Sequence, residues 1–132
     1  VTGVEWITTT ADKSDGFTLS VRVRYNEAVT VNTTGGTPTL AVTNGNEGSG
    51  SGRGPHSLSY ASGSGTNELV FSLAIAAGNA ATNEDDVLTV GAQNIALNSG
   101  TMKDTGGDGT TDSAVAISAD QGTACGSITV VA

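Results

Sequence analysis

A β-hairpin is encoded between Tyr60 and Ile75, and it restricts the fold of this chain more than any other feature. A strand-like run meets the turn residues Gly63, Ser64 and Gly65, and a second run then alternates strictly. Apolar residues take one parity and polar or small residues take the other, which is the period of a strand with one buried face. The apolar set is Leu69, Phe71, Leu73 and Ile75, and the other set includes Glu68, Ser72 and Ala74.

The segment Phe17–Tyr25 shows the same alternation over a longer run. Its odd-numbered positions are apolar or aromatic, whereas its even-numbered positions are Thr18, Ser20, Arg22 and Arg24. Val29 and Val31 keep this parity beyond Glu27. Either Glu27 points inward or the strand bends there, as strands do at a bulge.

Further short apolar runs predict the remaining strands. Val4–Trp6 is expected to open the sheet with Trp6 in the core, and residues 11–16 are expected to form a polar turn. Pro38 places the run that follows it at a sheet edge, because proline donates no ladder hydrogen bond. The other runs are Val87–Val90, Ile95–Leu97, Val115–Ile117 and Ser127–Ala132.

The chain has 132 residues, the length of one domain with a substantial core. Nineteen glycines and 14% charged residues favour short strands and many turns. Apolar spacing typical of helices is absent apart from one short turn at 74–77. Short connections favour antiparallel pairing over parallel pairing, so we expect an all-β, antiparallel β-sandwich of about seven to nine strands.

The charge of the chain restricts its partners. Five basic and thirteen acidic residues give a net charge of −8, which disfavours nucleic acid and anionic membranes. Arg22 and Arg24 are expected to pair with acids or to stay solvated, and Arg53 is isolated in a glycine-rich loop that lacks a phosphate-binding motif. No apolar run approaches the length of a membrane span, so membrane insertion is not expected.

Candidate catalytic residues are few. His56 could act on a serine as a base, but a lone histidine at a strand end more often has no such role. The adjacent acids Glu84, Asp85 and Asp86 are expected to be solvated, and 4% aromatic residues argue against a sugar-binding cleft. The prediction is therefore that the chain is not an enzyme and has no catalytic or cofactor-binding residues. Cys125, the single cysteine, is either a free thiol or half of an intermolecular bridge.

A metal site has one candidate segment. Asp104, Asp108 and Asp112 lie among glycines and threonines, and calcium prefers oxygen ligands in flexible loops. The order of residues in an EF-hand loop is absent. A solvated acidic turn is therefore the expectation, with no metal assigned, and a calcium site is the alternative.

Four segments together resemble the immunoglobulin-like repeats of large bacterial surface adhesins, of the hyalin-like and cyanobacterial long-repeat type. The segments are Val21–Val31, Gly36–Leu40, Tyr60–Phe71 and Leu97–Asp104. Similar modules decorate phage virions. The resemblance implies an immunoglobulin-like β-sandwich without catalytic activity, and in such adhesins calcium often stiffens the joints between repeats.

The resemblance covers about residues 4–118, and it divides the chain into an immunoglobulin-like domain, 1–120, and a tail, 121–132, with a strand-like segment. We expect a structural subunit on a virion surface, a capsid decoration or cement protein, whose partners are capsid or tail subunits. The alternative is an extender or ligand-binding repeat of an extracellular adhesin at a bacterial cell surface. In the first interpretation the tail docks to the particle, and deleting residues 127–132 leaves a folded monomer.

Overall fold

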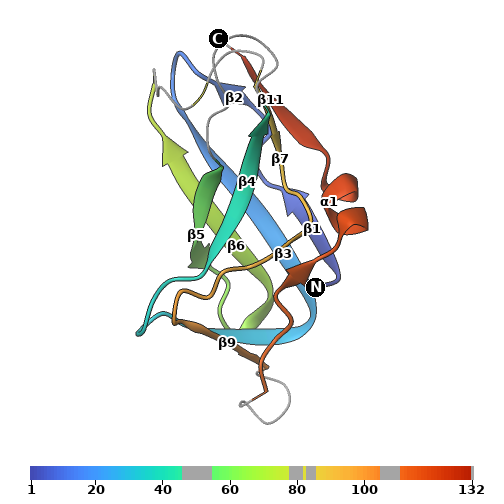
Figure 1. Ribbon diagram of the computed structural model, residues 1–132. Helices are drawn as coiled ribbons and strands as arrows, with labels where there is room; N and C mark the ends of the chain where they lie inside the picture. Colours follow the sequence, from blue (N-terminus) through green and yellow to red (C-terminus); the bar gives the residue numbers. More distant parts are fainter. Residues whose placement is uncertain (46–54, 78–81, 83–85, 105–110, 132) are drawn as a thin grey trace.

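The computed structural model describes residues 1–45, 55–77, 82, 86–104 and 111–131. These residues form an all-β fold with one short helix (Figure 1). The elements are β1 Gly3–Trp6, β2 Ala11–Asp12, β3 Phe17–Asn32, β4 Thr39–Gly45, β5 His56–Ser62, β6 Thr66–Ile75, β7 Val87–Thr89, β8 Gln93–Asn94, β9 Thr101–Asp104, β10 Ala116–Ile117, α1 Ala119–Cys125 and β11 Ser127–Val131.

One curled sheet contains most of the strands, in the order β1-β3-β6-β5-β4-β7-β11-β2. Strand β4 carries the sheet from one half to the other, since Thr39–Val42 pair with β5 and Thr43–Gly45 pair with β7. Strand β9 adds to the far end of β3, and β8 and β10 form a separate pair.

The alternation in β3 and β6 produces the core, as the sequence predicts. Val21 and Val23 of β3 pair with Phe71 and Leu69 of β6, and these four side chains are fully buried. Leu19, also fully buried, pairs with Leu73, which is half-buried. Tyr25, Val29 and Ile75 continue this buried face. Around it pack Val4, Ala11, Leu40, Val42, Leu58, Leu88, Val90, Ile95, Met102, Ile117 and Val130.

Strand β3 bends at the position where its pattern breaks. Its register with β6 shifts between Arg24 and Val29, and Glu27 is exposed. The expectation of a bend is confirmed, and Glu27 does not point into the core. Val29 still pairs with Thr66 of β6, and residues 29–32 pair with β9.

The predicted hairpin is confirmed as β5 and β6. Gly63 and Gly65 have φ values of +109° and +87°, which a side chain rarely adopts. A Cβ at Gly63 would also collide with the carbonyl oxygen of Glu68. The amide of Thr66 donates to the carbonyl of Gly63 at 3.0 Å and closes the turn.

Two local expectations are wrong, and a third is confirmed in part. Strand β4 is not an edge strand, because Pro38 lies just before the ladder and the strand pairs with both β5 and β7. The expected turn at 11–16 is present at residues 13–15, but Ala11 and Asp12 form the short strand β2. Trp6 is half-buried at the rim of the core, where its indole Nε1 donates to the carbonyl of Gly126 at 3.3 Å.

Helix α1 was not expected from the apolar periodicity, because seven residues are too few to show it. A capping box begins the helix: the amide of Gln121 donates to Ser118 Oγ at 3.1 Å, and the amide of Ser118 donates to Gln121 Oε1 at 2.9 Å. The Gln121 side chain also donates to the carbonyl of Val1 at 2.7 Å. The helix thus lies beside the outer edge of the sheet at β1 (Figure 1).

The predicted terminal strand is present as β11, but it lies inside the sheet. It pairs antiparallel with β7 and parallel with β2, so the sheet is mixed and not purely antiparallel. Val130 is fully buried, and its amide donates to the carbonyl of Asp86 at 2.9 Å. Deleting residues 127–132 would remove a strand with two neighbours, so we now expect unfolding in place of a released monomer.

Candidate functional site

Four charged side chains form a closed ladder on the outer face of β1, β3 and β6. Arg22 lies 2.6 Å from Glu5 and 3.5 Å from Glu68, and Arg24 lies 2.7 Å and 2.5 Å from the same two acids. Hydrogen bonds from both arginines hold the pKa of Glu5 below its usual value, and Glu5 in turn raises the pKa of Arg24. The expected pairing of the two arginines with acids is confirmed.

The surface beside this charge ladder carries small side chains. Across β3 and β6, Thr18 stands opposite Ala74 and Ser20 stands opposite Ser72, with the parity that points away from the core. Val70, opposite Arg22, completes the row. This part of the outer face therefore combines small uncharged side chains with a charge ladder whose own net charge is zero.

A buried polar cluster lies at the end of the sheet where β4 ends and β5 begins. His56, Thr82 and Asp86 are 7%, 0% and 0% exposed, and Asn44 is 6% exposed. The Nε2 atom of His56 is 3.4 Å from the hydroxyl oxygen of Thr82. Burial lowers the pKa of His56, and the charge of Asp86 opposes that shift.

The expected solvation of these acids is wrong for Asp86, whereas Glu84 and Asp85 lie outside the described residues. The sequence holds a signal for this burial. Asp86 has the parity of the buried residues Leu88 and Val90, and Asn44 continues the inward parity of Leu40 and Val42. A polar residue in phase with an apolar strand face is positioned to be buried.

A hydroxyl, an imidazole and a carboxylate together are the groups of a nucleophile, a base and an orienting acid. Here their burial keeps a substrate from reaching the hydroxyl of Thr82. Strand β11 closes one side, because the amide of Val130 binds the carbonyl of Asp86. The arrangement fits an internal anchor for the ends of β4, β5 and β7 better than it fits an active site.

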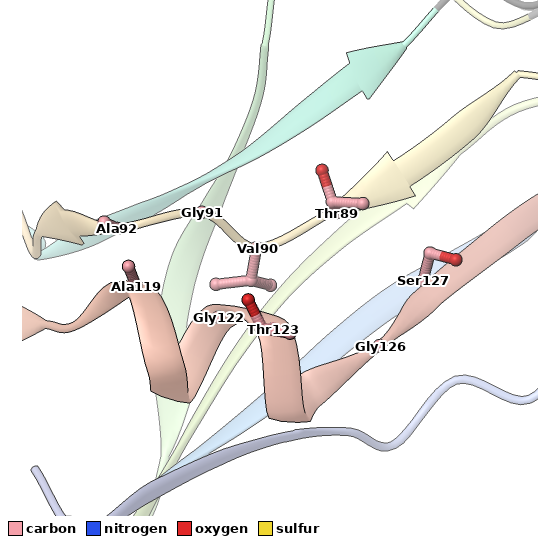
Figure 2. Close-up of a pocket in the computed structure, with 9 residues that line it drawn as sticks. All are labelled: Thr89, Val90, Gly91, Ala92, Ala119, Gly122, Thr123, Gly126 and Ser127. Carbon is pink, nitrogen blue, oxygen red and sulfur yellow. The ribbon is translucent and has the colours of Figure 1, made fainter.

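A shallow groove of about 390 Å³ runs between the end of β7 and α1 (Figure 2). Its polar side chains are the hydroxyls of Thr89, Thr123 and Ser127, and none of its lining residues is ionisable. Figure 2 shows the side chain of Val90 between the strand and the helix. A Cβ at Gly122 would lie 2.6 Å from the carbonyl oxygen of Val90, so helix and strand are in backbone contact. Small neutral linings of this kind offer contact area but no acid or base.

A second hollow of about 150 Å³ contains two of the three calcium candidates. Asp104 and Asp112 line it with Glu27 and Tyr25, while Asp108 lies outside the described residues. Lys103 forms an ion pair with Asp112. The hydroxyl of Tyr25 donates to the carbonyl of Ala114 at 2.8 Å, and burial raises its pKa to about 12.

Within the described ranges, no group of three or more His, Cys, Asp or Glu side chains is arranged to hold a metal. Asp108 lies outside those ranges, so the expected solvated turn and the alternative calcium site both stay untested at that residue. Strand β3 brings Glu27 to the same hollow, which spacing along the sequence did not indicate.

Cys125 ends helix α1 and is half-buried. Burial raises the pKa of its thiol, which keeps it in the less reactive protonated form. Neither a free thiol nor an intermolecular bridge is tested by this geometry.

Comparison of the chain with protein-family models, with curated proteins and with solved structures found no match in any of the three. In the described part of the chain, no helix has the length and apolar character needed to cross a membrane.

Proposed function

We propose that this chain is a non-catalytic structural module with immunoglobulin-like topology that decorates or cements a large assembly such as a phage virion. The observation that carries the proposal is the strand order. An immunoglobulin sandwich of the constant type has strands A, B, E and D in one sheet and C, F and G in the other.

Assigned in chain order, β1, β3, β4, β5, β6, β7 and β11 become A to G. The observed order β1-β3-β6-β5 then reads A-B-E-D, and β4-β7-β11 reads C-F-G. Strand β2 is an addition beside G. This agreement supports an immunoglobulin-like sandwich whose two halves are joined through the β4–β5 hairpin.

The segments that carry the adhesin resemblance lie against one another in space. Residues 101–104 pair with 29–32, which links the last of the four segments to the first. A Cβ at Gly36 would collide with the carbonyl oxygen of Asn98, and the Asn98 side chain donates to the carbonyl of Thr37 at 2.9 Å. These residues hold turns together, which supports a structural explanation of the shared pattern.

The distribution of ionisable groups supports a role without catalysis. The larger groove has no ionisable lining residue, the histidine is buried, and the two β3 arginines are engaged by acids on an open face. An enzyme of this size would need convergent acid, base or nucleophilic groups facing a cleft.

The position of β11 changes the expected mode of docking. Residues 127–129 pair with β7 and residues 130–131 pair with β2, so the tail is engaged within its own sheet and strand addition through it is disfavoured. Faces of the sheet and turns are left as contact surfaces to other subunits.

An extender repeat of a bacterial surface adhesin is the second candidate, and one observation favours it. The hollow lined by Asp104 and Asp112 offers carboxylate oxygens, the type of ligand that calcium binds.

The mass of native material from its source, measured by light scattering with and without a calcium chelator, separates these candidates. A particle of megadalton mass in both conditions supports the virion subunit. A long single polypeptide that contains several copies, and whose repeats lose thermal stability in chelator, supports the adhesin. A small free protein indifferent to chelator contradicts both.

A further inference from the structure

We propose that the outer face of β1, β3 and β6 is a self-association surface, and that its occupant is the same face of a second copy of this chain. The charge ladder of Glu5, Arg22, Arg24 and Glu68 sets the register of the contact. This inference rests on the proposed role as an assembly module, and it identifies the surface through which neighbouring modules contact each other.

The distribution of charge selects this face. The ladder holds two of the five basic residues and two of the thirteen acidic ones, so its own charge is zero. The net charge of −8 therefore lies elsewhere on the chain. Two copies repel each other wherever their acidic surfaces approach, and this repulsion is smallest where neutral faces meet.

The layout of the ladder is complementary to itself. Glu5 stands beside Arg22 across the β1–β3 ladder, and Arg24 stands beside Glu68 across the β3–β6 ladder. A two-fold axis that runs parallel to the strands between β3 and β6, which are roughly 5 Å apart, brings each residue of a β3–β6 pair onto the other residue in the partner copy. Arg24 of each copy then meets Glu68 of the other, and Ser20 of each copy meets Ser72 of the other.

The side chains of the ladder are accessible for this contact. The arginines are 32% and 44% exposed and the glutamates 43% and 37%. The small residues Thr18, Ser20, Ser72 and Ala74 lie beside them, so two such faces can approach as closely as sheets do when they pack face to face.

The two ends of the whole sheet are less suited to pairing. Helix α1 lies beside β1 and binds the carbonyl of Val1 through Gln121. At the other end of the strand order, β2 is only two residues long. Short or covered edges resist strand addition, which leaves the face as the surface for a second copy.

The test inverts the ladder without changing its internal pairing. The variant Glu5→Arg, Arg22→Glu, Arg24→Glu, Glu68→Arg keeps every acid beside a base and keeps the net charge. Sedimentation velocity of the purified chains should show that wild type and variant each form dimers as concentration rises. Mixed dimers, detected by energy transfer between labelled copies, should form at least about tenfold less readily, because like charges would face each other.

A matched control exchanges an ion pair elsewhere. The variant Lys103→Asp, Asp112→Lys should mix with wild type in statistical proportion. If the inverted ladder also mixes statistically, the contact lies on another surface and the proposal fails. It fails equally if wild type stays monomeric at all concentrations.

If the inverted variant does not fold, a distance measurement between spin labels tests the same contact. A label placed at Ser72→Cys, with Cys125→Ser, should give a short distance between copies in the dimer, and a dimer without that distance contradicts the proposal. These experiments test only the contact between two copies. If they contradict it, the proposed function is still tested separately by the mass of the native material.

Discussion

Phe71 of β6 pairs with Tyr60 of β5 in the predicted hairpin. Its side chain is fully buried, and its ring meets Tyr60 edge to face with centroids 6.2 Å apart. We expect Phe71→Ala to reduce the free energy of unfolding by about 3–5 kcal/mol, since it removes a ring that its neighbours can replace only in part. Urea denaturation measures the loss. Ser72→Ala, on the outer face, should change stability by less than about 0.5 kcal/mol, and an equal effect of both changes would contradict the assigned faces.

His56 gives the stability a pH dependence of known sign. Burial lowers its pKa in the folded chain below the ordinary value of 6.5, so between these two values the unfolded chain binds more protons. The stability that neutral His56 contributes is complete above pH 6.5 and is lost as the pH falls toward the lowered pKa. Among the described residues, Asp86 is the charged group that acts on His56, and its attraction limits the loss.

Urea midpoints between about pH 8 and about pH 5 measure this dependence. The variant His56→Gln should lack it. The pKa values of Glu5 and Asp12 are lowered from 4.5 and 3.8, so their contributions are lost only at still lower pH. A wild-type midpoint that does not fall in this interval would show that folded His56 is protonated as easily as unfolded His56.

Local parity predicts the apolar residues of the core well and predicts its polar residues less well. Leu69 and Val23 are buried as their alternation indicates. Asp86 follows the same rule, since its parity is that of the buried strand residues. Three adjacent acids, however, usually indicate solvent exposure, and this is why exposure was predicted for Asp86. Its neighbours are distant in sequence: the amide of Val130 binds the backbone carbonyl of Asp86, and His56 interacts with the charge of its side chain.

At the scale of elements, two turns at one end of the molecule are packed backbone against backbone. Gly35 and Gly36 meet the turn at 97–100, in which Asn98 and Ser99 have φ values of +52° and +70°. We expect Gly36→Ala to cost about 1–3 kcal/mol, because its Cβ would overlap the carbonyl oxygen of Asn98.

Thermal denaturation of that variant has a matched control in Gly3→Ala. A Cβ at Gly3 would meet nothing within 4 Å, and the residue lies in β1. This control should leave the midpoint nearly unchanged. If both alanine variants melt alike, the contact between the two turns does not stabilise the fold.

Sequence patterns predict where strands lie better than which strands pair. The runs that became β3, β5, β6 and β11 are recognisable from alternation, and Ser118 with Gln121 formed a capping-box signal for α1. Parallel pairing of β2 with β11 joins residues more than a hundred positions apart and has no local signature. The interior place of β4 follows from partners on both of its sides, which a single proline before the strand does not reveal.

At the scale of the whole molecule, four of the charged side chains are paired in the charge ladder, whereas the residues that give the net charge of −8 lie outside it. The charge ladder holds contacts of 2.5–3.5 Å, and the other eleven of the thirteen acidic residues lie outside it. The candidate calcium site and the proposed pairing face both follow from this separation. The first would neutralise some of the dispersed acids, and the second avoids them.

The effect of added salt on the melting temperature therefore has an expected direction. Raising NaCl from about 0.01 M to about 0.1 M shortens the screening length from about 30 Å to about 10 Å, which weakens repulsion among dispersed acids but barely affects the ladder contacts. We expect the melting temperature to rise by about 2–4 °C, equivalent to roughly 1 kcal/mol. A fall would mean that ion pairs outweigh the repulsion expected from a net charge of −8.

Calcium chloride at the same ionic strength extends this measurement to the acidic hollow. A further rise beyond that in NaCl, abolished by Asp104→Asn or Asp112→Asn and kept in Asp120→Asn, would assign a calcium ion to the hollow and favour the adhesin repeat. Asp120 is a suitable control because it is exposed on α1 and is not one of the residues that line the hollow. Equal melting temperatures in the two salts would leave charge screening as the whole effect and would favour the virion subunit.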